Sequence, residues 1–150
     1  MIKTITDALY TTRSTAIFLA LLLASSHAYS QCPQYRKIAQ APSALFNQPN
    51  PLELTRQHLR AGKRAYKSRD VGCYKCHGKK GTGDGPLALS FAPPPRNFTC
   101  AETMASIPDG QLFWGIKHGV PNTAMPAHPA LSDEQIWQLV LVLRGMVDKD

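Results

Sequence analysis

The sequence predicts a small all-α domain with long loops. Three observations carry this prediction: three stretches repeat apolar residues at helical spacing, the 12 prolines and 10 glycines fall mostly between those stretches, and no stretch shows the strict alternation of a half-buried strand. A chain of 150 residues with 43% hydrophobic residues has room for one small domain. Most large enzyme folds are therefore excluded.

The first 28 residues have the features of a secretory signal peptide. Lys3 and Arg13 precede an apolar run over 16–24, and Ser26 and Ala28 place small residues three and one before a cleavage site. The run is shorter than the roughly 20 apolar residues of a membrane-spanning helix. We therefore expect cleavage after Ala28 and a mature chain that does not span a membrane, the alternative being an uncleaved anchor. Export places the protein in the periplasm, where disulfides can form.

The charge of the chain is basic but modest. Seventeen Lys and Arg against ten Asp and Glu give +7, and removal of residues 1–28 leaves fifteen against nine, or +6. The positive residues are dispersed and no basic stripe is interleaved with aromatic residues. Nucleic acid is therefore not an expected partner.

The mature chain divides into an extension and a domain. Residues 29–54 contain Pro33, Pro42, Pro49 and Pro51 among polar residues and have neither helical nor alternating periodicity, so we expect an extended, Pro-rich N-terminal segment. The helical stretches all lie within residues 55–150, which form the predicted domain.

The first helix is predicted over 55–69. Leu59, Gly62, Ala65 and Tyr66 share one face, and the basic residues of the stretch lie mostly on the other. Glycine and proline dominate the next segment, from 72 to 100, where we expect loop with one short turn near 87–91 and little regular structure.

Two further helices are predicted from their caps. Ser106 resembles an N-cap with Asp109 as its acidic partner, and Gly119 resembles a C-cap, which gives a helix over 107–118. Ser132 and Gln135 form a capping box at the start of a helix over 133–146. The apolar positions of this last helix follow the i, i+3, i+4 rhythm at Ile136, Leu139, Val140, Leu143 and Val147.

Three short helices bury too little apolar surface to hold a long glycine-rich and proline-rich loop. The sequence Cys73-Tyr74-Lys75-Cys76-His77 offers a solution, because C-x-x-C-H is the attachment signature of c-type haem. Two ordinary cysteines, a thiol-redox motif and half of a zinc site are the alternatives. The redox motif would need a βαβ context, and zinc would need a second ligand pair.

Several motifs occur in the order typical of one family. The chain resembles the class I, single-haem, His/Met-ligated c-type cytochromes of the bacterial periplasm over residues 55–147. The motifs are Cys-Tyr-Lys-Cys-His-Gly at 73–78, Gly-Thr-Gly-Asp-Gly-Pro at 81–86, Pro-Pro-Arg-Asn-Phe-Thr at 94–99, Asp-Gly-Gln-Leu-Phe-Trp at 109–114 and Thr-Ala-Met-Pro at 123–126. The resemblance implies a cytochrome c-like fold of three main helices and long loops around one covalently bound haem c. It also implies that Gly62 and Tyr66 cross the helix of Trp137 and Val140.

The second axial ligand of the iron has six candidates in the mature chain: Met104, Met125, Met146, His58, His118 and His128. Met125 lies in an irregular segment between the second and third helices, where the family places its thioether ligand. A thioether suits a low-spin iron and raises its reduction potential relative to two imidazoles. His118 is the best rival, at the end of the neighbouring helix, and we expect His128 at the surface.

The surroundings of the haem follow from the same resemblance. His77 should donate its second ring N–H to a backbone carbonyl of Pro93, Pro94 or Pro95, and the resemblance favours Pro94 or Pro95. Arg96 either binds a haem propionate or forms an exposed salt bridge. Four apolar residues are assigned to the haem pocket, with ordinary core packing as the alternative for each: Phe98, Leu112, Phe113 and Trp114.

Two features remain after these assignments. Cys32 and Cys100 are an even remainder in an exported chain, so we expect one disulfide, with mixed disulfides to a partner as the alternative. The glycine-rich segment 78–85 lacks the spacing and the preceding strand of a phosphate-binding loop, and we expect a flexible turn there.

These features predict a periplasmic one-electron carrier rather than an enzyme. Electrons would pass to and from redox partner proteins, a reductase or an oxidase. Four lysines on the haem side would steer the protein to an acidic patch on the partner: Lys75, Lys79, Lys80 and Lys117. Alternatives are a haem subunit of a larger oxidoreductase complex, a haem c enzyme or gas sensor with a labile sixth ligand, and a haemless thiol-redox or zinc module.

Overall fold

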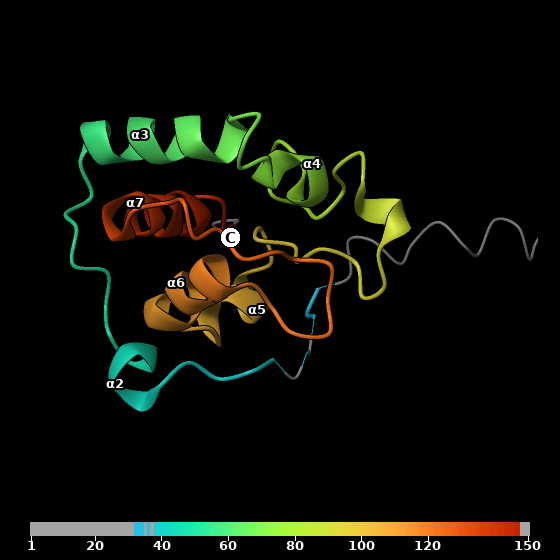
Figure 1. Ribbon diagram of the computed structural model, residues 1–150, viewed down its shortest axis with the longest axis horizontal. Helices are drawn as coiled ribbons and strands as arrows, with labels where there is room; N and C mark the ends of the chain where they lie inside the picture. The colour runs from blue at the N-terminus through green and yellow to red at the C-terminus, as the bar shows by residue number, and fades with distance from the viewer. Residues whose placement is uncertain (1–31, 35, 37, 148–150) are drawn as a thin grey trace, which may run out of the picture.

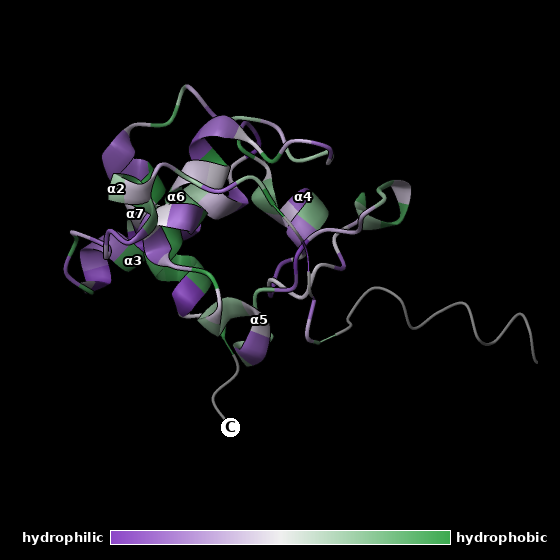
Figure 2. Ribbon diagram, turned by 90° about the horizontal axis from the view of Figure 1, so that it is seen from below, coloured by the Kyte–Doolittle hydropathy of each residue, from purple (hydrophilic) through white to green (hydrophobic). Residues whose placement is uncertain are grey.

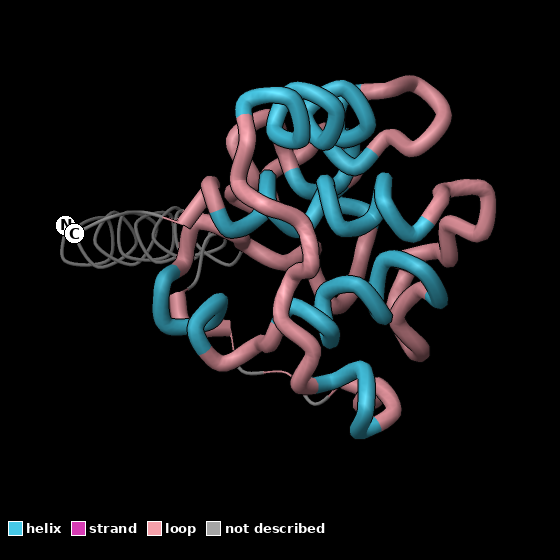
Figure 3. Tube along the Cα trace, turned by 90° about the vertical axis from the view of Figure 1, so that its left-hand side faces the viewer, coloured by secondary structure: helices cyan, strands magenta, loops and turns pink. Residues whose placement is uncertain are grey.

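The computed structural model describes residues 32–34, 36 and 38–147, a part of the chain built from helices and loops without a strand (Figures 1 and 3). The predicted signal peptide, residues 1–28, lies outside the described residues. Within the described part, no helix combines the length and the apolar character that crossing a bilayer requires. The helical elements are α2 (Ser43–Phe46), α3 (Arg56–Lys67), α4 (Cys73–His77), η2 (Ala88–Ser90), α5 (Ala101–Ala105), α6 (Asp109–His118) and α7 (Asp133–Arg144). The predicted all-α fold is confirmed.

The two 12-residue helices, α3 and α7, lie side by side and form the core of the molecule (Figure 1). Gly62 on α3 allows the close approach, because a Cβ there would overlap the carbonyl oxygen of Gln138 and lie 2.8 Å from Val142 Cγ2. The crossing predicted at Gly62 is therefore confirmed. Its nearest neighbours on α7 are Gln138 and Val142, however, and not the expected Trp137 and Val140.

Helix α7 begins where the sequence predicts, at Asp133, and α3 begins one residue after its predicted start, at Arg56. The capping box of Ser132 and Gln135 is complete, and the side chain of Thr55, for which no cap was predicted, accepts a hydrogen bond from the His58 amide at 3.1 Å. Each helix ends two residues before its predicted end, at Lys67 and Arg144. The capping box at the start of α7 is thus more informative than the apolar periodicity at its end.

Arg144, at the end of α7, joins three helices. Its Nε lies 2.6 Å from Asp109 Oδ1 at the start of α6, and its terminal nitrogens donate to the carbonyls of Met104 and Ile107 near the end of α5. This single side chain therefore ties the end of α7 to the start of α6 and to two backbone carbonyls at and just after α5.

The start of α6 differs from the prediction. Ser106 does not cap it: its hydroxyl donates to the carbonyl of Thr103 at the end of the unpredicted helix α5, and the N-cap residue is Pro108. The predicted end at His118, followed by Gly119, is confirmed. A five-residue helix such as α5 is too short for a period to show in the sequence.

The N-terminal extension folds back onto the domain. We call its described residues from Cys32 to Asn50 the strap. The strap contains the short helix α2, which packs against α6 (Figure 1). The predicted disulfide between Cys32 and Cys100 is present and ties the start of the strap to the residue before α5.

Candidate functional site

Helix α4 carries the C-x-x-C-H sequence and is only five residues long, too short to be stable by itself. The glycine-rich loop that follows supplies the missing hydrogen bonds. The amides of Gly83, Gly85 and Leu87 donate to the carbonyls of His77, Cys76 and Lys75 at 2.9, 3.0 and 2.9 Å. Gly85 is required for this packing, because a Cβ there would overlap the carbonyl oxygen of Lys75. The segment expected to be a flexible turn is thus a structural cap for α4. The short turn predicted near 87–91 is present as η2, whereas the five-residue helix α4 was not predicted.

The two cysteines of α4 line one cavity and are not bonded to each other. Burial, with a smaller contribution from the neighbouring Cys76, raises the pKa of Cys73 to about 11, and burial also raises the pKa of Cys76. Thiol-redox cysteines act as thiolates with a lowered pKa, so these values oppose the thiol-redox alternative. Among the described residues, the group that could hold a metal through three His, Cys, Asp or Glu side chains contains the disulfide pair and neither α4 cysteine. The zinc alternative is therefore unsupported.

The imidazole of His77 is oriented by its neighbours. Its Nδ1 lies 3.0 Å from the carbonyl oxygen of Arg96, and the ring stacks on Phe98 with 4.4 Å between the centroids. Because a carbonyl only accepts, Nδ1 carries the proton and Nε2 keeps its lone pair. Burial is the main cause that lowers the pKa of His77 to about 4, so the ring is neutral at pH 7. A neutral imidazole with a free Nε2 is a metal ligand.

The acceptor of the His77 proton differs from the prediction. It is the carbonyl of Arg96, one residue after the three prolines, and not that of Pro94 or Pro95. Both of these prolines line the cavity and hold the chain extended beside the ring. The rigid proline segment therefore places the Arg96 carbonyl, and not a proline carbonyl, within hydrogen-bond distance of His77 Nδ1.

Met125 lies in a loop closed by its own hydrogen bonds. The Met125 amide donates to Thr123 Oγ1 at 3.1 Å, and that hydroxyl donates to the Val120 carbonyl at 2.7 Å. The Val120 amide in turn donates to the Met125 carbonyl at 3.2 Å. The loop between α6 and α7 thus fixes the backbone from which the thioether extends.

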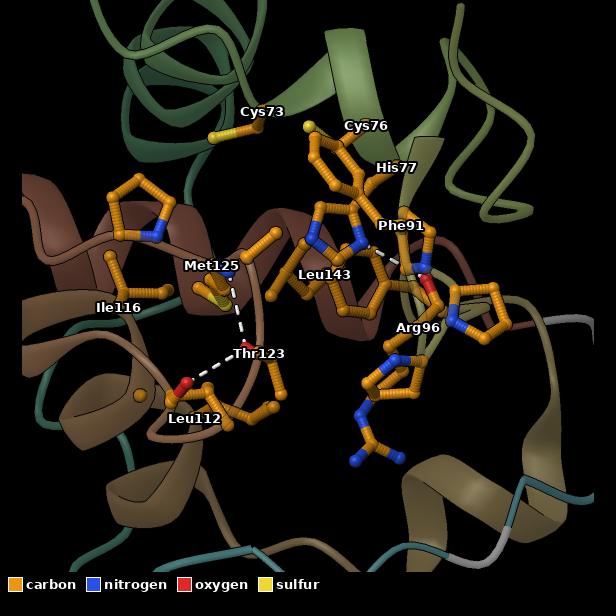
Figure 4. A pocket seen from close by; sticks show the side chains of 18 of the residues that line it. Cys73, Cys76, His77, Phe91, Arg96, Leu112, Ile116, Thr123, Met125 and Leu143 are labelled. Atoms are coloured by element: carbon orange, nitrogen blue, oxygen red, sulfur yellow. Dashed lines mark hydrogen bonds between the residues drawn. The ribbon is translucent and has the colours of Figure 1, made fainter. Parts of the chain in front are cut away.

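Cys73, Cys76, His77 and Met125 line the same cavity of about 270 Å³. Figure 4 shows the three α4 side chains on one side and Met125 on the other, with Leu143 of α7 between them and the guanidinium of Arg96 pointing into the lower part of the view. The lining is mainly apolar and comes from α6, α7 and the loops, including Leu112, Ile116, Val120, Phe91, Phe98 and Ile107. The fold thus brings together four residues that lie up to half the domain apart in sequence.

The other candidate axial ligands are placed differently. Met104 is buried in the core cluster and Met146 packs beside it, and neither lines the cavity. His118 is exposed, and its ring packs at a tilt against that of Trp114. His128, expected at the surface, instead lies half-buried at the cavity, because its amide donates to the Ile116 carbonyl and holds this part of the loop against α6. His58 is not among the lining residues either.

Two of the four aromatic and apolar pocket assignments are wrong. Phe98 and Leu112 line the cavity, whereas Phe113 stacks on Trp137 in the core and Trp114 packs against His118. In a buried helix with apolar residues on most sides, the sequence does not show which face meets a cavity, which explains why Ile116 was not predicted. Ile107 and Val120 also line the cavity, from the segments before and after α6.

These residues fit a covalently bound haem. Two uncharged thiols lie one helical turn apart, an oriented neutral imidazole follows them, a methionine stands opposite, and the walls between are apolar. The residues that would hold the group are Cys73 and Cys76 through thioether bonds and His77 through Nε2. This donor set is the one that the C-x-x-C-H signature requires.

The comparisons with known proteins agree with this geometry. The family model for cytochrome c matches residues 59–146. A chain of the reducing HAO-like protein complex of Kuenenia stuttgartiensis is similar in structure, with a TM-score of 0.58 and 27% identity over 76% of this chain and 53% of that chain. This chain therefore spans about half the length of that relative. No curated protein sequence matches. The chain belongs to the cytochrome c family, whose cofactor is covalently bound haem c and whose chemistry is electron transfer.

Proposed function

We propose that the protein is a one-electron carrier of the bacterial periplasm, with His77 and Met125 as the two axial ligands of its haem. The observation that carries the proposal is the presence of Met125 on the cavity wall opposite α4. When bound, haem c supplies a ferric/ferrous couple, and two strong protein ligands favour electron transfer over reactions at the iron.

The chain's own residues prepare this site. The Arg96 carbonyl holds the Nδ1 proton of His77 and so fixes the ring plane. Thr123 fixes the backbone that leads to Met125, because its hydroxyl bonds both the Met125 amide and the Val120 carbonyl. Apolar side chains of α6 and α7, among them Leu112, Ile116 and Leu143, line the space between the two ligands. An iron whose two axial positions are both filled by protein side chains has no open position for a substrate or a gas, which disfavours the enzyme and gas-sensor alternatives.

The partner surface is proposed to lie around α4. Lys75 lines the cavity, with its Nζ donating to the Arg69 carbonyl at 3.1 Å, and Lys79 and Lys80 are exposed beside it. Lys117 is a weaker candidate than the sequence suggested, because its Nζ pairs with Asp133 at 2.6 Å. We expect the first three lysines to steer the protein to an acidic patch, so that the association rate with its partner falls as salt rises.

A second candidate function is that of a haem subunit. It is favoured by the similarity to a chain of a complex, the reducing HAO-like protein complex. In that case the carrier domain would act within an assembly and would co-purify with its partner from the native source. A stable complex at physiological salt would support the subunit role, and a free monomer would support the carrier role.

The axial ligation is tested by near-infrared absorption of the ferric protein. A thioether ligand gives a sulfur-to-iron charge-transfer band, which should be present in the wild type, absent from Met125→Leu and retained in Met146→Leu, the matched control outside the cavity. Carbon monoxide should leave the spectrum of the ferrous wild type unchanged. A band that survives in Met125→Leu, or a bis-imidazole spectrum that disappears in His128→Gln, would contradict the proposed ligation.

A further inference from the structure

The strap is fastened to the domain on the same side as the cavity. It lies outside residues 59–146, the part that the cytochrome c family model matches. The disulfide Cys32–Cys100 attaches its start. Next to it, the Gln34 amide donates to Thr103 Oγ1 and Gln34 Oε1 accepts from the Asn97 amide, both at 2.8 Å. Further along, Gln111 Oε1 accepts from the Ala41 amide at 2.8 Å and Gln111 Nε2 donates to the Ala39 carbonyl at 3.1 Å. These contacts hold the strap in one register across α5 and α6.

The strap contributes side chains to the cavity. Arg36 and Ile38 line it together with the α4 residues. Arg36 and Arg96 also both line a second cavity of about 560 Å³ beneath the strap. The two residues therefore share both cavities, and the charge of Arg36 is felt at Arg96, although 60 residues separate them in the sequence.

Among the described residues, neither arginine has an anionic partner. Within the described part of the chain the ion pairs are Lys117–Asp133 and Arg144–Asp109, and neither Arg36 nor Arg96 takes part in one. Burial lowers the pKa of both groups, and the charge of Arg36 adds to the effect that lowers the pKa of Arg96 to about 10. Two half-buried cations side by side are unfavourable unless a negative charge lies between them.

We propose that Arg36 of the strap and Arg96 together bind the carboxylates of the haem, and that the strap is a wall of the haem pocket. The inference rests on the haem site proposed above. Guanidinium groups bind carboxylates through paired, charge-assisted hydrogen bonds, and haem carries two propionates at one edge. The disulfide then has a defined role: it anchors the strap four residues before Arg36.

The test compares Arg36→Gln and Arg36→Lys with Arg60→Gln, a matched control on the exposed face of α3. The midpoint potential and the carboxylate bands of the redox-difference infrared spectrum are measured for each holoprotein. Arg36→Gln should lower the potential, with a several-fold rise in the ferric fraction at a fixed applied potential, because the loss of a nearby cation favours the ferric state. Arg36→Lys should keep most of the potential but shift the carboxylate bands, since an ammonium group cannot bind in bidentate fashion.

The source of the carboxylate is tested by adding acetate or citrate. Haem propionates predict that neither anion changes the potential of the wild type at constant ionic strength. A saturable shift that Arg36→Gln abolishes would show that the arginines bind a free organic anion, and would overturn the proposal. So would an Arg36→Gln protein with the potential and infrared bands of Arg60→Gln. A normal Met-ligated spectrum in that protein would leave the proposed function intact, whereas a wild type without haem would remove the proposed function itself.

Discussion

The helical core and the pocket side of the molecule are held together by different means. In Figure 2, α2, α3, α6 and α7 lie together on the left, and α4 lies to their right. The α3 and α7 side chains Tyr66, Ile136, Leu139 and Val140 are at most 1% exposed, so apolar packing stabilises that group. On the pocket side, hydrogen bonds from loop amides, the Thr123 hydroxyl and the strap hold the chain in place.

This difference shows which region needs the haem. Side chains of α3 and α7 fill the space between these two helices. On the pocket side the chain instead surrounds a cavity of about 270 Å³, a volume that a larger domain would fill with side chains. Tyr66 connects the two regions, because its hydroxyl donates to the Gly78 carbonyl at 2.8 Å. The core therefore positions the end of α4, and the haem supplies the apolar volume that the pocket side lacks.

The largest expected effect lies on the pocket side. Replacing both Cys32 and Cys100 by serine should lower the free energy of unfolding by up to about 4 kcal/mol, because the disulfide closes a loop over 68 positions of separation. Urea titration of the holoprotein measures the loss. Amide exchange should show the first openings in the strap, with α3 and α7 still protected. Equal stability of the variant and the wild type would mean that the strap is held without the disulfide.

The next largest effect is expected from a substitution at the crossing of α3 and α7 in the core. Gly62→Val should cost about 3 kcal/mol or more, because its side chain would overlap the Gln138 carbonyl and force α3 away from α7. Gly145→Ala is the matched control: the nearest atom to its Cβ is 3.5 Å away, and its φ of −75° suits alanine. Thermal unfolding of both variants measures the difference. If Gly62→Val unfolded at the same temperature as Gly145→Ala, the close crossing of α3 and α7 would be wrong.

A smaller effect is expected at the loop that carries Met125. Thr123→Val removes the hydroxyl that bonds both the Met125 amide and the Val120 carbonyl, at a cost of about 2 kcal/mol. The thioether band should then be lost at a lower temperature or lower alkaline pH than in the wild type. Thr82→Val is a control, because its hydroxyl bonds only the exposed Asp84. Identical band stability in the two variants would show that Thr123 does not position the ligand.

The smallest effect is expected at the start of α7. Ser132→Ala removes the side-chain acceptor of the Gln135 amide at 3.2 Å and should cost about 1 kcal/mol. Ser132→Asp keeps an acceptor and should retain the stability of the wild type. Urea titration detects the difference, while the haem spectrum should stay the same in both variants. A change in that spectrum would mean that the core and the pocket side are coupled more tightly than the packing indicates.

The same division explains what the sequence could predict. Helix α7 was predicted from Ser132 and Gln135 because a capping box is a local signal, whereas the crossing at Gly62 followed from the resemblance to class I cytochromes. The cofactor followed from a five-residue motif. The residues that line the cavity could not be predicted. They depend on which face of α6 points into the cavity and on which loop residues pack against it.

Arg36 and His128 illustrate that limit. Each is a single polar residue in an irregular segment, and nothing in its neighbours gives a period or a motif. Their places at the cavity come from long-range contacts: the strap is held by Gln111 and the disulfide, and the loop after α6 by the Ile116 carbonyl. The carbonyl that orients His77 is likewise that of Arg96, directly after the predicted Pro94 or Pro95. A proline segment determines its own backbone conformation, but it does not determine which of the neighbouring carbonyls lies beside the imidazole.

The central claim is that one haem, bonded to Cys73 and Cys76, completes the interior of this domain. Intact mass spectrometry of periplasmically expressed protein, combined with a pyridine haemochrome spectrum of the denatured chain, tests it most directly. The account predicts the mass of the polypeptide plus one haem and the spectrum of a porphyrin with two thioether bonds, and the loss of both in the double variant Cys73→Ser, Cys76→Ser. A colourless wild type of unmodified mass that is nevertheless fully folded would contradict it.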